Sequence, residues 1–174
     1  MNIHEHHLKS PTQIITTQLG IPQEYKQHCI KEIYSLGDSM NQQTNVKAIM
    51  SSYKIWEETN ILNQLINNIK ITIDECYPPK NKKFKYNLVD AWSAIYKKSH
   101  YTIPHNHLPF QVSFVYYLQS SGYTPLVFDE CNFQINPTDD MLIVFPSNLI
   151  HSVPEHTEEN DRICLAGNLS WTFF

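Results

Sequence analysis

The sequence PHNHLP at Pro104–Pro109 contains two histidines, His105 and His107, separated by one residue. In an extended strand, alternate side chains point to the same face, so these two imidazoles would lie side by side. A third histidine, His151, follows the apolar run Met141–Phe145, which is typical of a buried strand. Three imidazoles on two strands make these histidines a candidate metal site.

Charge adds a second feature to this pattern. The chain has a single arginine, Arg162, which lies eleven residues after His151 and opens the apolar stretch Arg162–Ala166. The twelve other basic residues are all lysines. The one guanidinium group of the chain is therefore expected at the start of a strand that follows the candidate metal site.

The chain from Phe84 onward has the pattern of short strands separated by turn residues. The seven predicted strands are Phe84–Ile95, Gln111–Gln119, Pro125–Phe128, Cys131–Ile135, Met141–Phe145, Ile150–Val153 and Arg162–Trp171. Many short strands with turn signals indicate a sandwich or barrel, so we expect a mainly β fold with an antiparallel core.

The N-terminal part has helical periodicity instead. A short strand is predicted at Thr12–Leu19, and a helix at Pro22–Leu36 is closed by a glycine. The polar segment Asp38–Ser52 is interpreted as a loop. A second helix is predicted from near Ser52 to Cys76, because its isoleucines and leucines recur at helical spacing before a Pro-Pro pair. These two helices should pack on the β core.

Length and composition indicate an ordinary globular protein. With 174 residues, 41% of them hydrophobic and 17% charged, the chain fits one domain, in which residues 1–83 support a β core at residues 84–174. A net charge of -4 does not favour nucleic-acid binding. The lysines that precede the first core strand are interpreted as a solvated turn: Lys80, Lys82, Lys83 and Lys85.

The remaining cysteines and histidines are given structural or surface roles. The cysteines are widely spaced, so neither a zinc knuckle nor a disulfide framework is expected. His4, His6 and His7 are interpreted as surface residues because a terminal segment rarely holds a fixed coordination geometry, and His100 and His156 as surface or rim residues. No apolar run is long enough for a membrane span, and the polar start is not a signal peptide, so we expect a cytoplasmic protein.

Several of these segments together resemble the non-haem Fe(II), 2-oxoglutarate-dependent oxygenases, and within them the prolyl-hydroxylase-like group with its small bacterial and phage relatives. The resemblance covers about Phe84–Trp171. The residues that carry it are Trp92, Tyr96, Pro104–His107, Val112–Leu118, Met141–Ser147, His151 and Arg162. It implies a double-stranded β-helix, or cupin-like jelly roll, whose mouth holds Fe(II) and 2-oxoglutarate.

The resemblance also implies roles for individual residues. His105 matches the first histidine ligand of the family and His151 matches the distal one, whereas His107 stands where the family has a carboxylate. A third neutral imidazole would still coordinate Fe(II) but would leave the metal one unit more positive. Arg162 matches the residue that binds the far carboxylate of 2-oxoglutarate, and Tyr117 and Tyr96 match tyrosines of the same pocket.

The expected activity is that of a dioxygenase, which uses dioxygen to couple oxidative decarboxylation of 2-oxoglutarate to hydroxylation of a protein side chain or small molecule. Two alternatives remain open at this stage. One is a cupin-like three-histidine metal enzyme that does not use 2-oxoglutarate. The other is a jelly-roll binding module without catalytic activity, because a fold does not by itself fix a function. The sequence names neither the substrate nor the oligomeric state.

Overall fold

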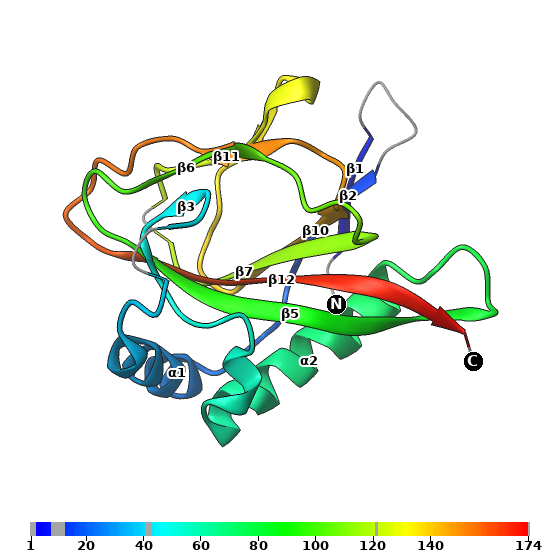
Figure 1. Cartoon of the computed structure of the whole chain (residues 1–174), viewed down its shortest axis with the longest axis horizontal. Coiled ribbons are helices and arrows are strands. Elements are labelled where there is room, and N and C mark those ends of the chain that lie inside the picture. The colour runs from blue at the N-terminus through cyan, green and yellow to red at the C-terminus, as the bar shows by residue number, and fades with distance from the viewer. Residues whose placement is uncertain (1–2, 8–12, 41–42, 121, 174) are drawn as a thin grey trace.

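The computed structural model describes residues 3–7, 13–40, 43–120 and 122–173, and within them two antiparallel sheets face each other (Figure 1). The larger sheet has seven strands in the order β1 (Ile3–His7), β2 (Gln13–Gln18), β10 (Met141–Pro146), β7 (Val112–Gln119), β12 (Arg162–Phe173), β5 (Phe84–Tyr96) and β4 (Ile49–Met50). The smaller sheet has five, in the order β3 (Val46–Lys47), β6 (Tyr101–His105), β11 (His151–Val153), β8 (Leu126–Phe128) and β9 (Phe133–Ile135).

Two helices, α1 (Gln23–Leu36) and α2 (Asn60–Cys76), cover the outer face of the larger sheet (Figure 1). The alternation of side chains along β7 explains this arrangement. Phe114 and Tyr116 belong to the core shared with the helices, whereas Val115 and Tyr117 belong to the core between the two sheets. A strand buried on both faces needs a continuous apolar sequence, which Phe114–Leu118 provides. The predicted mainly β jelly roll with supporting helices is confirmed.

The second helix begins later than predicted. A single turn of 3-10 helix, η1 (Ile55–Glu57), precedes it, and α2 starts only at Asn60. The physical reason is the cap: Thr59 has an extended backbone, and its hydroxyl accepts a hydrogen bond from the Leu62 N–H at 3.3 Å. Such a residue satisfies one free N–H of the first turn and fixes where a helix starts.

The segment interpreted as a loop at 38–52 contains the short strands β3 and β4. The structure pairs β3 with β6 and β4 with β5, so this one segment bridges the two sheets at their edges. Val46, Ala48 and Met50 are all buried. Their period-two spacing is a strand signal, but it is too short to be distinguished from a loop without the partner strands.

Two further strands were not among the seven predicted. Strand β6 lies between β3 and β11, and β1 pairs with β2 at the far edge of the larger sheet. The side chain of His4 on β1 is exposed, as predicted, whereas the side chains of His6 and His7 lie outside the described residues. A second 3-10 turn, η2 (Asp129–Cys131), occupies the start of the segment predicted as one strand at 131–135.

The prediction that His156 lies on the surface or rim is wrong. Its side chain has 0% exposure, one ring nitrogen lies 2.8 Å from the Thr124 hydroxyl, and the other lies 2.8 Å from the Asn160 carbonyl oxygen. With both ring nitrogens in hydrogen bonds, His156 holds the loop before β12 against the loop before β8, which is a structural role. The four cysteines are free. Within the described ranges, the helices are too short or too polar to cross a membrane.

Candidate metal centre and adjoining cavities

The three candidate histidines meet where the interior strands β6 and β11 of the smaller sheet end and begin. His105 is the last residue of β6 and pairs directly with His151, the first residue of β11. The predicted extended strand does not continue to His107, which lies in the turn that follows β6. The His107 N–H donates a hydrogen bond to the Ser147 carbonyl at 2.8 Å, and this bond holds the turn against the end of β10.

The imidazole rings lie close enough to share one ion. Their centroids are 4.8 Å apart for His105 and His107, 4.5 Å for His105 and His151, and 5.0 Å for His107 and His151. One nitrogen from each ring can be chosen so that all three lie within 4.8 Å of one another. The structure therefore brings together the three residues that the sequence singled out.

Hydrogen bonds orient two of these rings. The Nδ1 atom of His105 lies 2.9 Å from the Ile103 carbonyl, and the Nδ1 atom of His151 lies 3.0 Å from the Leu149 carbonyl. A carbonyl oxygen can only accept, so Nδ1 carries the proton in both rings and the Nε2 lone pair is left for a metal. A backbone carbonyl on the second nitrogen is the usual support of metal-binding histidines.

Burial keeps the three imidazoles neutral. Desolvation lowers the pKa of His105, and it lowers the pKa of His151 to about 4, with a further contribution from the neighbouring His105. The pKa of His107 falls to about 3, because of burial and then of the charges that His151 and His105 would carry. Neutral imidazoles have a free lone pair at neutral pH, which is the form that binds transition metals.

The donor set fits a divalent first-row metal. Imidazole nitrogen suits iron, nickel, copper and zinc, and three such ligands leave further coordination positions for other molecules. In the described part of the chain, no carboxylate joins this group of three. A metal held here would therefore keep its full positive charge and attract an anionic ligand.

A buried arginine lies in the space between the two sheets. Arg162, at the start of β12, is 1% exposed, and its guanidinium carbon lies 4.6 Å from the Tyr96 ring centroid and 5.0 Å from the Tyr117 ring centroid. Its Nη2 donates a hydrogen bond to the Tyr117 hydroxyl at 3.0 Å. Its Nε and Nη1 are buried and have no hydrogen-bond partner among the described residues.

Two unpartnered donor nitrogens on a buried cation are unusual, because an uncompensated buried charge costs several kcal/mol. In a guanidinium, Nη2 forms a planar fork with Nε on one side and with Nη1 on the other, and either fork can bind a carboxylate through two parallel hydrogen bonds. The chemistry of the missing partner is therefore that of a small anion. These two unpartnered nitrogens, one in each fork, are the observation by which the pocket fits the carboxylate of an oxoacid.

The two tyrosines of the pocket remain protonated. Burial raises the pKa of Tyr96, and it raises the pKa of Tyr117 to about 12. The Tyr96 hydroxyl lies 2.6 Å from the Thr102 hydroxyl on β6, so it joins the floor of the pocket to the opposite sheet. Tyr117, whose hydroxyl accepts from Arg162, orients the guanidinium.

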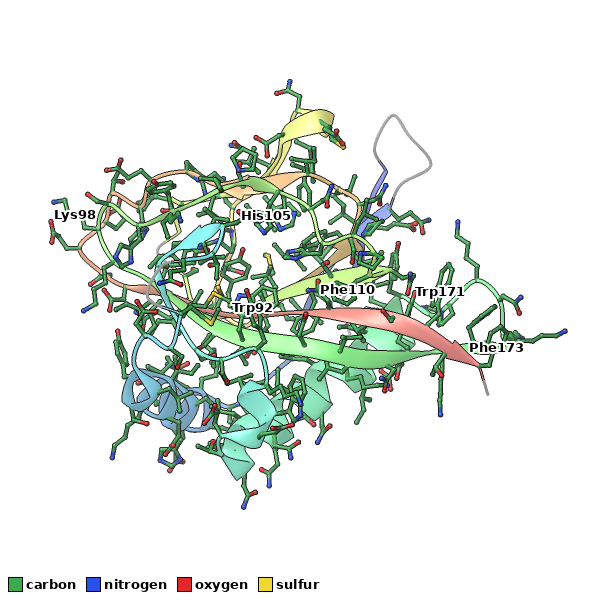
Figure 2. All side chains as sticks on the ribbon, viewed as in Figure 1. Trp92, Lys98, His105, Phe110, Trp171 and Phe173 are labelled. Atoms are coloured by element: carbon green, nitrogen blue, oxygen red, sulfur yellow. The ribbon has the colours of Figure 1, made fainter. Side chains whose placement is uncertain are left out.

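Side chains of β5 and β12, small next to Arg162 and ending in Trp92, form a floor between Arg162 and the histidines. On β5 and β12 the residue pairs that follow Arg162 and Tyr96 are Cys164 with Ala94 and Ala166 with Trp92. A narrow inner cavity of about 40 Å³ lies over this floor, and its lining includes all three histidines and Arg162. Figure 2 labels His105 on the smaller sheet and Trp92 on the larger one, on the two sides of this space.

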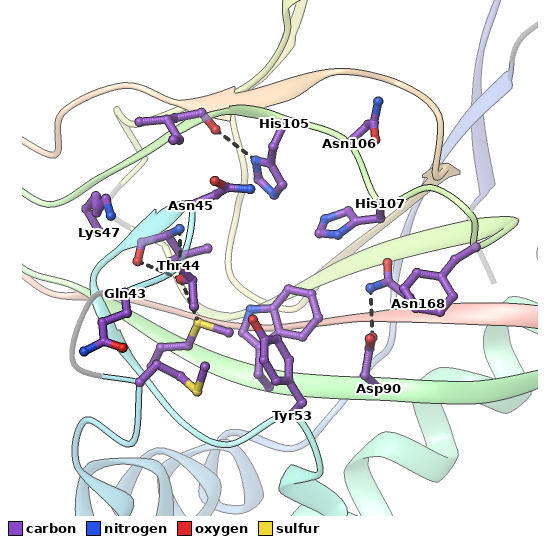
Figure 3. A pocket seen from close by; sticks show the side chains of 16 residues that line it. Gln43, Thr44, Asn45, Lys47, Tyr53, Asp90, His105, Asn106, His107 and Asn168 are labelled. Atoms are coloured by element: carbon purple, nitrogen blue, oxygen red, sulfur yellow. Dashed lines mark hydrogen bonds between the residues drawn. The ribbon is translucent and has the colours of Figure 1, made fainter.

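A wider outer cavity of about 670 Å³ adjoins the inner one, and His105, His107 and Trp92 line both. Figure 3 shows the outer cavity with His105 and His107 on one side and Asp90, hydrogen-bonded to Asn168, on another. The histidines therefore stand between a small cavity that ends at a buried cation and a large one of the size that small-molecule sites have.

Sequence reasoning did not single out two residues of this outer cavity, Asp90 and Asn168. The sequence does contain a signal for Asp90. Alternate residues of a strand lie on one face, so Asp90 shares a face of β5 with Trp92, Ala94 and Tyr96. A charged residue on the face that otherwise turns inward is a site signal. It was missed because the segment was interpreted only as a strand.

Comparison with known proteins gives a result for structure and none for sequence. No model of a known protein family matches the sequence. No curated protein matches it either. Similarity is found only with solved structures, at sequence identities that show the fold alone.

The viral collagen prolyl hydroxylase vCPH from Paramecium Bursaria Chlorella virus-1, solved as a 2-oxoglutarate complex, is 12% identical, with a TM-score of 0.68 over 90% of this chain and 94% of that one. A prolyl-4-hydroxylase from Pseudomonas putida is 15% identical, with a TM-score of 0.62 over 90% of this chain and 91% of that one. HygX from Streptomyces hygroscopicus, solved with nickel and 2-oxoglutarate bound, is 10% identical, with a TM-score of 0.70 over 92% of this chain and 84% of that one.

The structural neighbours are members of the 2-oxoglutarate and Fe(II) oxygenase family and include viral and bacterial prolyl hydroxylases. The resemblance seen in the sequence is thus confirmed at the level of fold: the chain has the jelly roll of these oxygenases. The roles of the individual site residues are untested by this similarity and belong to the proposal that follows.

Proposed function

We propose that the protein is an Fe(II)- and 2-oxoglutarate-dependent dioxygenase that hydroxylates a small molecule or a protein side chain. The observation that carries the proposal is the pair of unpartnered donor nitrogens of Arg162, Nε and Nη1, in one narrow cavity with the three convergent histidines. A buried cation without an anion suits the carboxylate of an oxoacid, and the neighbouring neutral imidazoles suit the metal to which that oxoacid would bind.

His105, His107 and His151 would hold the metal. The two carbonyl bonds that fix the Nδ1 protons of His105 and His151 leave Nε2 of each ring free to bind an ion. When bound, Fe(II) supplies the oxygen chemistry: one atom of dioxygen enters succinate as carbon dioxide leaves 2-oxoglutarate, and the other becomes the hydroxyl group of the substrate.

Arg162, Tyr117 and Tyr96 would hold the oxoacid. The far carboxylate would accept from Nη2 of Arg162 together with one of its unpartnered nitrogens, Nε or Nη1, while Tyr117 keeps the guanidinium oriented. Because the side chains of Ala94, Cys164 and Ala166 are small, they leave open space between Arg162 and the histidines. The pocket lies between the two sheets, ends at the buried Arg162 and adjoins the outer cavity.

The solved structures support this assignment of cofactors. HygX was solved with nickel and 2-oxoglutarate, and the viral prolyl hydroxylase with 2-oxoglutarate, and both share the fold of this chain. Prolyl hydroxylases also occur among the neighbours. At these low identities, the substrate of this chain is not carried over from any of them.

One observation favours a second function. The third donor is His107 and not a carboxylate, and a neutral three-histidine set also suits metal enzymes that do not use 2-oxoglutarate. That alternative gives Arg162 a different anion as its partner. Titration with 2-oxoglutarate therefore separates the two functions.

The test is anaerobic metal and cosubstrate binding on the whole chain. We expect one Fe(II) or Ni(II) per chain in the wild type, saturable binding of 2-oxoglutarate to the loaded protein by calorimetry, and loss of metal in His105→Ala and His151→Ala. Succinate formed on admission of oxygen, with and without candidate substrates, is the catalytic readout. His156→Gln serves as the matched control, since His156 is buried but distant from the group of three.

Each result has a definite consequence. Undiminished metal in both alanine variants would remove the metal site. Metal binding without 2-oxoglutarate binding would favour the three-histidine enzyme. Tight binding of both without succinate formation would favour a binding module.

A further inference from the structure

The floor of the two cavities carries opposite charges at its two ends. Arg162 pairs with Tyr96 at the inner end of β12 and β5, and Asn168 pairs with Asp90 six residues further along, in the outer cavity. Six residues of extended strand span roughly 20 Å. The histidines lie between these ends, so a molecule in the outer cavity meets the metal site on one side and a carboxylate on the other.

Asp90 is held in place but has no counter-ion. Its Oδ1 accepts a hydrogen bond from Asn168 Nδ2 at 2.8 Å. The Asn168 Oδ1 in turn accepts a bond from the buried Ser113 hydroxyl at 2.7 Å. Across the described residues, no lysine, arginine or histidine forms an ion pair with Asp90.

This support extends to the metal site. The Ser113 hydroxyl lies 2.8 Å from the Ser147 hydroxyl, and Ser147 is the residue whose carbonyl accepts the N–H of His107. A chain of buried hydrogen bonds thus connects the carboxylate to the turn that carries one of the histidines. Half-buried carboxylates are costly to desolvate without a cation, so a network built to hold one charged and facing a cavity is a feature of a binding site.

Two aromatic rings continue the wall from Asp90 towards the histidines. The Tyr53 and Trp92 rings make an edge-to-face contact with centroids 5.4 Å apart, and the Trp92 ring lies 5.7 Å from that of His107. The Tyr53 carbonyl accepts a bond from the Ala91 N–H at 2.8 Å, which fixes Tyr53 beside β5. Burial and the nearby charge of Asp90 raise the pKa of the Tyr53 hydroxyl.

A carboxylate beside electron-rich ring faces is the chemistry that recognises an organic cation, because both the charge and the ring quadrupole attract positive nitrogen. Figure 3 shows that Lys47, the other charged residue lining this cavity, lies on the side opposite Asp90. The amides of Asn45 and Asn106 contribute neutral donors and acceptors. Anionic molecules would be repelled at the Asp90 wall.

Resting on the proposed function, we infer that the substrate carries a cationic nitrogen, an ammonium or a guanidinium, which Asp90 binds against the rings of Tyr53 and Trp92. This contact would leave a neighbouring carbon of the substrate facing His105 and His107. Asp90 would thus be a specificity residue for the substrate, on the opposite side of the metal from the arginine that binds the oxoacid.

The experiment compares the charge preference of the outer cavity in wild type and in Asp90→Asn. The probes are n-butylammonium and n-butylguanidinium, with butyramide and butyrate as neutral and anionic counterparts, followed by ligand-observed NMR. Titrations use the Ni(II)- and 2-oxoglutarate-loaded protein and the metal-free protein. Asparagine keeps an acceptor for Asn168, and Glu75→Gln, an exposed site on α2, makes the same charge change away from the cavity.

We expect the wild type and Glu75→Gln to bind both cations at least tenfold more tightly than butyramide or butyrate. Asp90→Asn should abolish that preference. Because the preference is a ratio measured on one sample, partial unfolding of the variant does not imitate its loss. An equal cation preference in wild type and Asp90→Asn, or a wild type that binds butyrate as well as n-butylammonium, would overturn the inference.

The metal-free titration keeps this result separate from the proposed function. A cation preference that depends on Asp90 in a protein that binds neither metal nor 2-oxoglutarate would retain the cation site and reject the dioxygenase. Metal and 2-oxoglutarate binding with no cation preference would retain the dioxygenase and reject the cation site.

Discussion

Arg162 and Asp90 lie at the two ends of the floor that β5 and β12 form, and they differ in burial and in hydrogen bonding. At the inner end, Arg162 is almost completely buried and lies between two tyrosine rings, and its Nε and Nη1 have no hydrogen-bond partner among the described residues. At the outer end, Asp90 is half-buried, hydrogen-bonded to Asn168 and open to a large cavity. Neither charged residue has a counter-ion among the residues that the structure describes, and both lie on the same face of the β5 and β12 pair.

The difference in burial indicates how strongly each charge depends on a ligand. A fully buried unpaired cation is expensive, so the inner end should bind one anion tightly and always in the same way. A half-buried carboxylate is partly hydrated, so the outer end can discriminate among molecules that exchange with solvent. The proposed oxygenase needs two such sites: an inner one that always binds the same cosubstrate, and an outer one that selects the substrate.

The largest effect should come from removing the charge of Arg162 at the inner end of the floor. Replacing Arg162 with leucine should weaken 2-oxoglutarate binding by about 3 kcal/mol, roughly 100-fold, because the carboxylate would be desolvated without a partner. Metal content should be unchanged, since Arg162 is not one of the three donors. Calorimetry on the metal-loaded protein measures this. Arg162→Lys, which keeps the charge but not the planar fork, should recover part of the affinity; equal affinity in wild type and Arg162→Leu would assign the arginine to another partner.

The second effect concerns the histidines between the two ends. Burial lowers the pKa of His151 to about 4 from an ordinary value near 6.5, so the unfolded chain takes up a proton at a higher pH than the folded one. The stability that His151 contributes is present above pH 6.5 and is lost as the pH falls towards 4. At pH 5 the loss should approach about 2 kcal/mol in the metal-free protein.

Urea unfolding of the metal-free protein at pH 7 and pH 5 measures this loss. The His151→Gln variant should show a smaller difference between the two pH values. His28→Gln, at an exposed position of α1, should behave as the wild type does. The same pH dependence in all three proteins would mean that other groups control acid stability.

A third experiment sharpens the comparison at His107, the donor that departs from the family pattern. His107→Ala should lower metal affinity at least tenfold, about 1.4 kcal/mol, because one of three donors is lost. His107→Asp should restore two histidines and one carboxylate, so iron should stay bound and succinate formation should persist or rise. Equal iron content and equal turnover in wild type and both variants would show that His107 is not a ligand.

The smallest effect should come from the outer end. Desolvation raises the pKa of Asp90, so the folded chain holds this proton to a higher pH than the unfolded chain does. The resulting stability is present below the unfolded pKa and is lost as the pH rises through the folded one. Asp90→Asn should therefore raise the unfolding free energy of the free protein at pH 7 by less than about 1 kcal/mol, after screening at a half-exposed site.

Thermal unfolding at pH 7, beside Glu75→Gln as the remote charge control, measures this change. If Asp90→Asn is slightly more stable and also loses the preference for cations, Asp90 contributes to binding and not to stability. A clear drop in stability would instead assign Asp90 to holding Asn168 in the sheet.

The sequence by itself determined the fold class and the residues that meet at the candidate metal centre. The reason is that both signals are local: apolar alternation marks each strand, and His105, His107 and Arg162 are conspicuous at their positions along the chain. The likeness to the oxygenase fold, carried by the segments from Trp92 to Arg162, is confirmed by the solved structures. The roles of these residues as ligands remain predictions.

Only the tertiary structure decided what depends on partners distant in sequence. The strands β3 and β4 exist because β6 and β5 pair with them, and His156 is buried because Thr124 and the Asn160 carbonyl lie across from its ring. The orphaned donors of Arg162 and the position of Asp90 in the outer cavity depend on burial, which is set by the packing of one sheet on the other. The local pattern of a strand determines the face on which a side chain lies. Whether that side chain meets a partner, solvent or an empty space depends on residues that are distant in sequence.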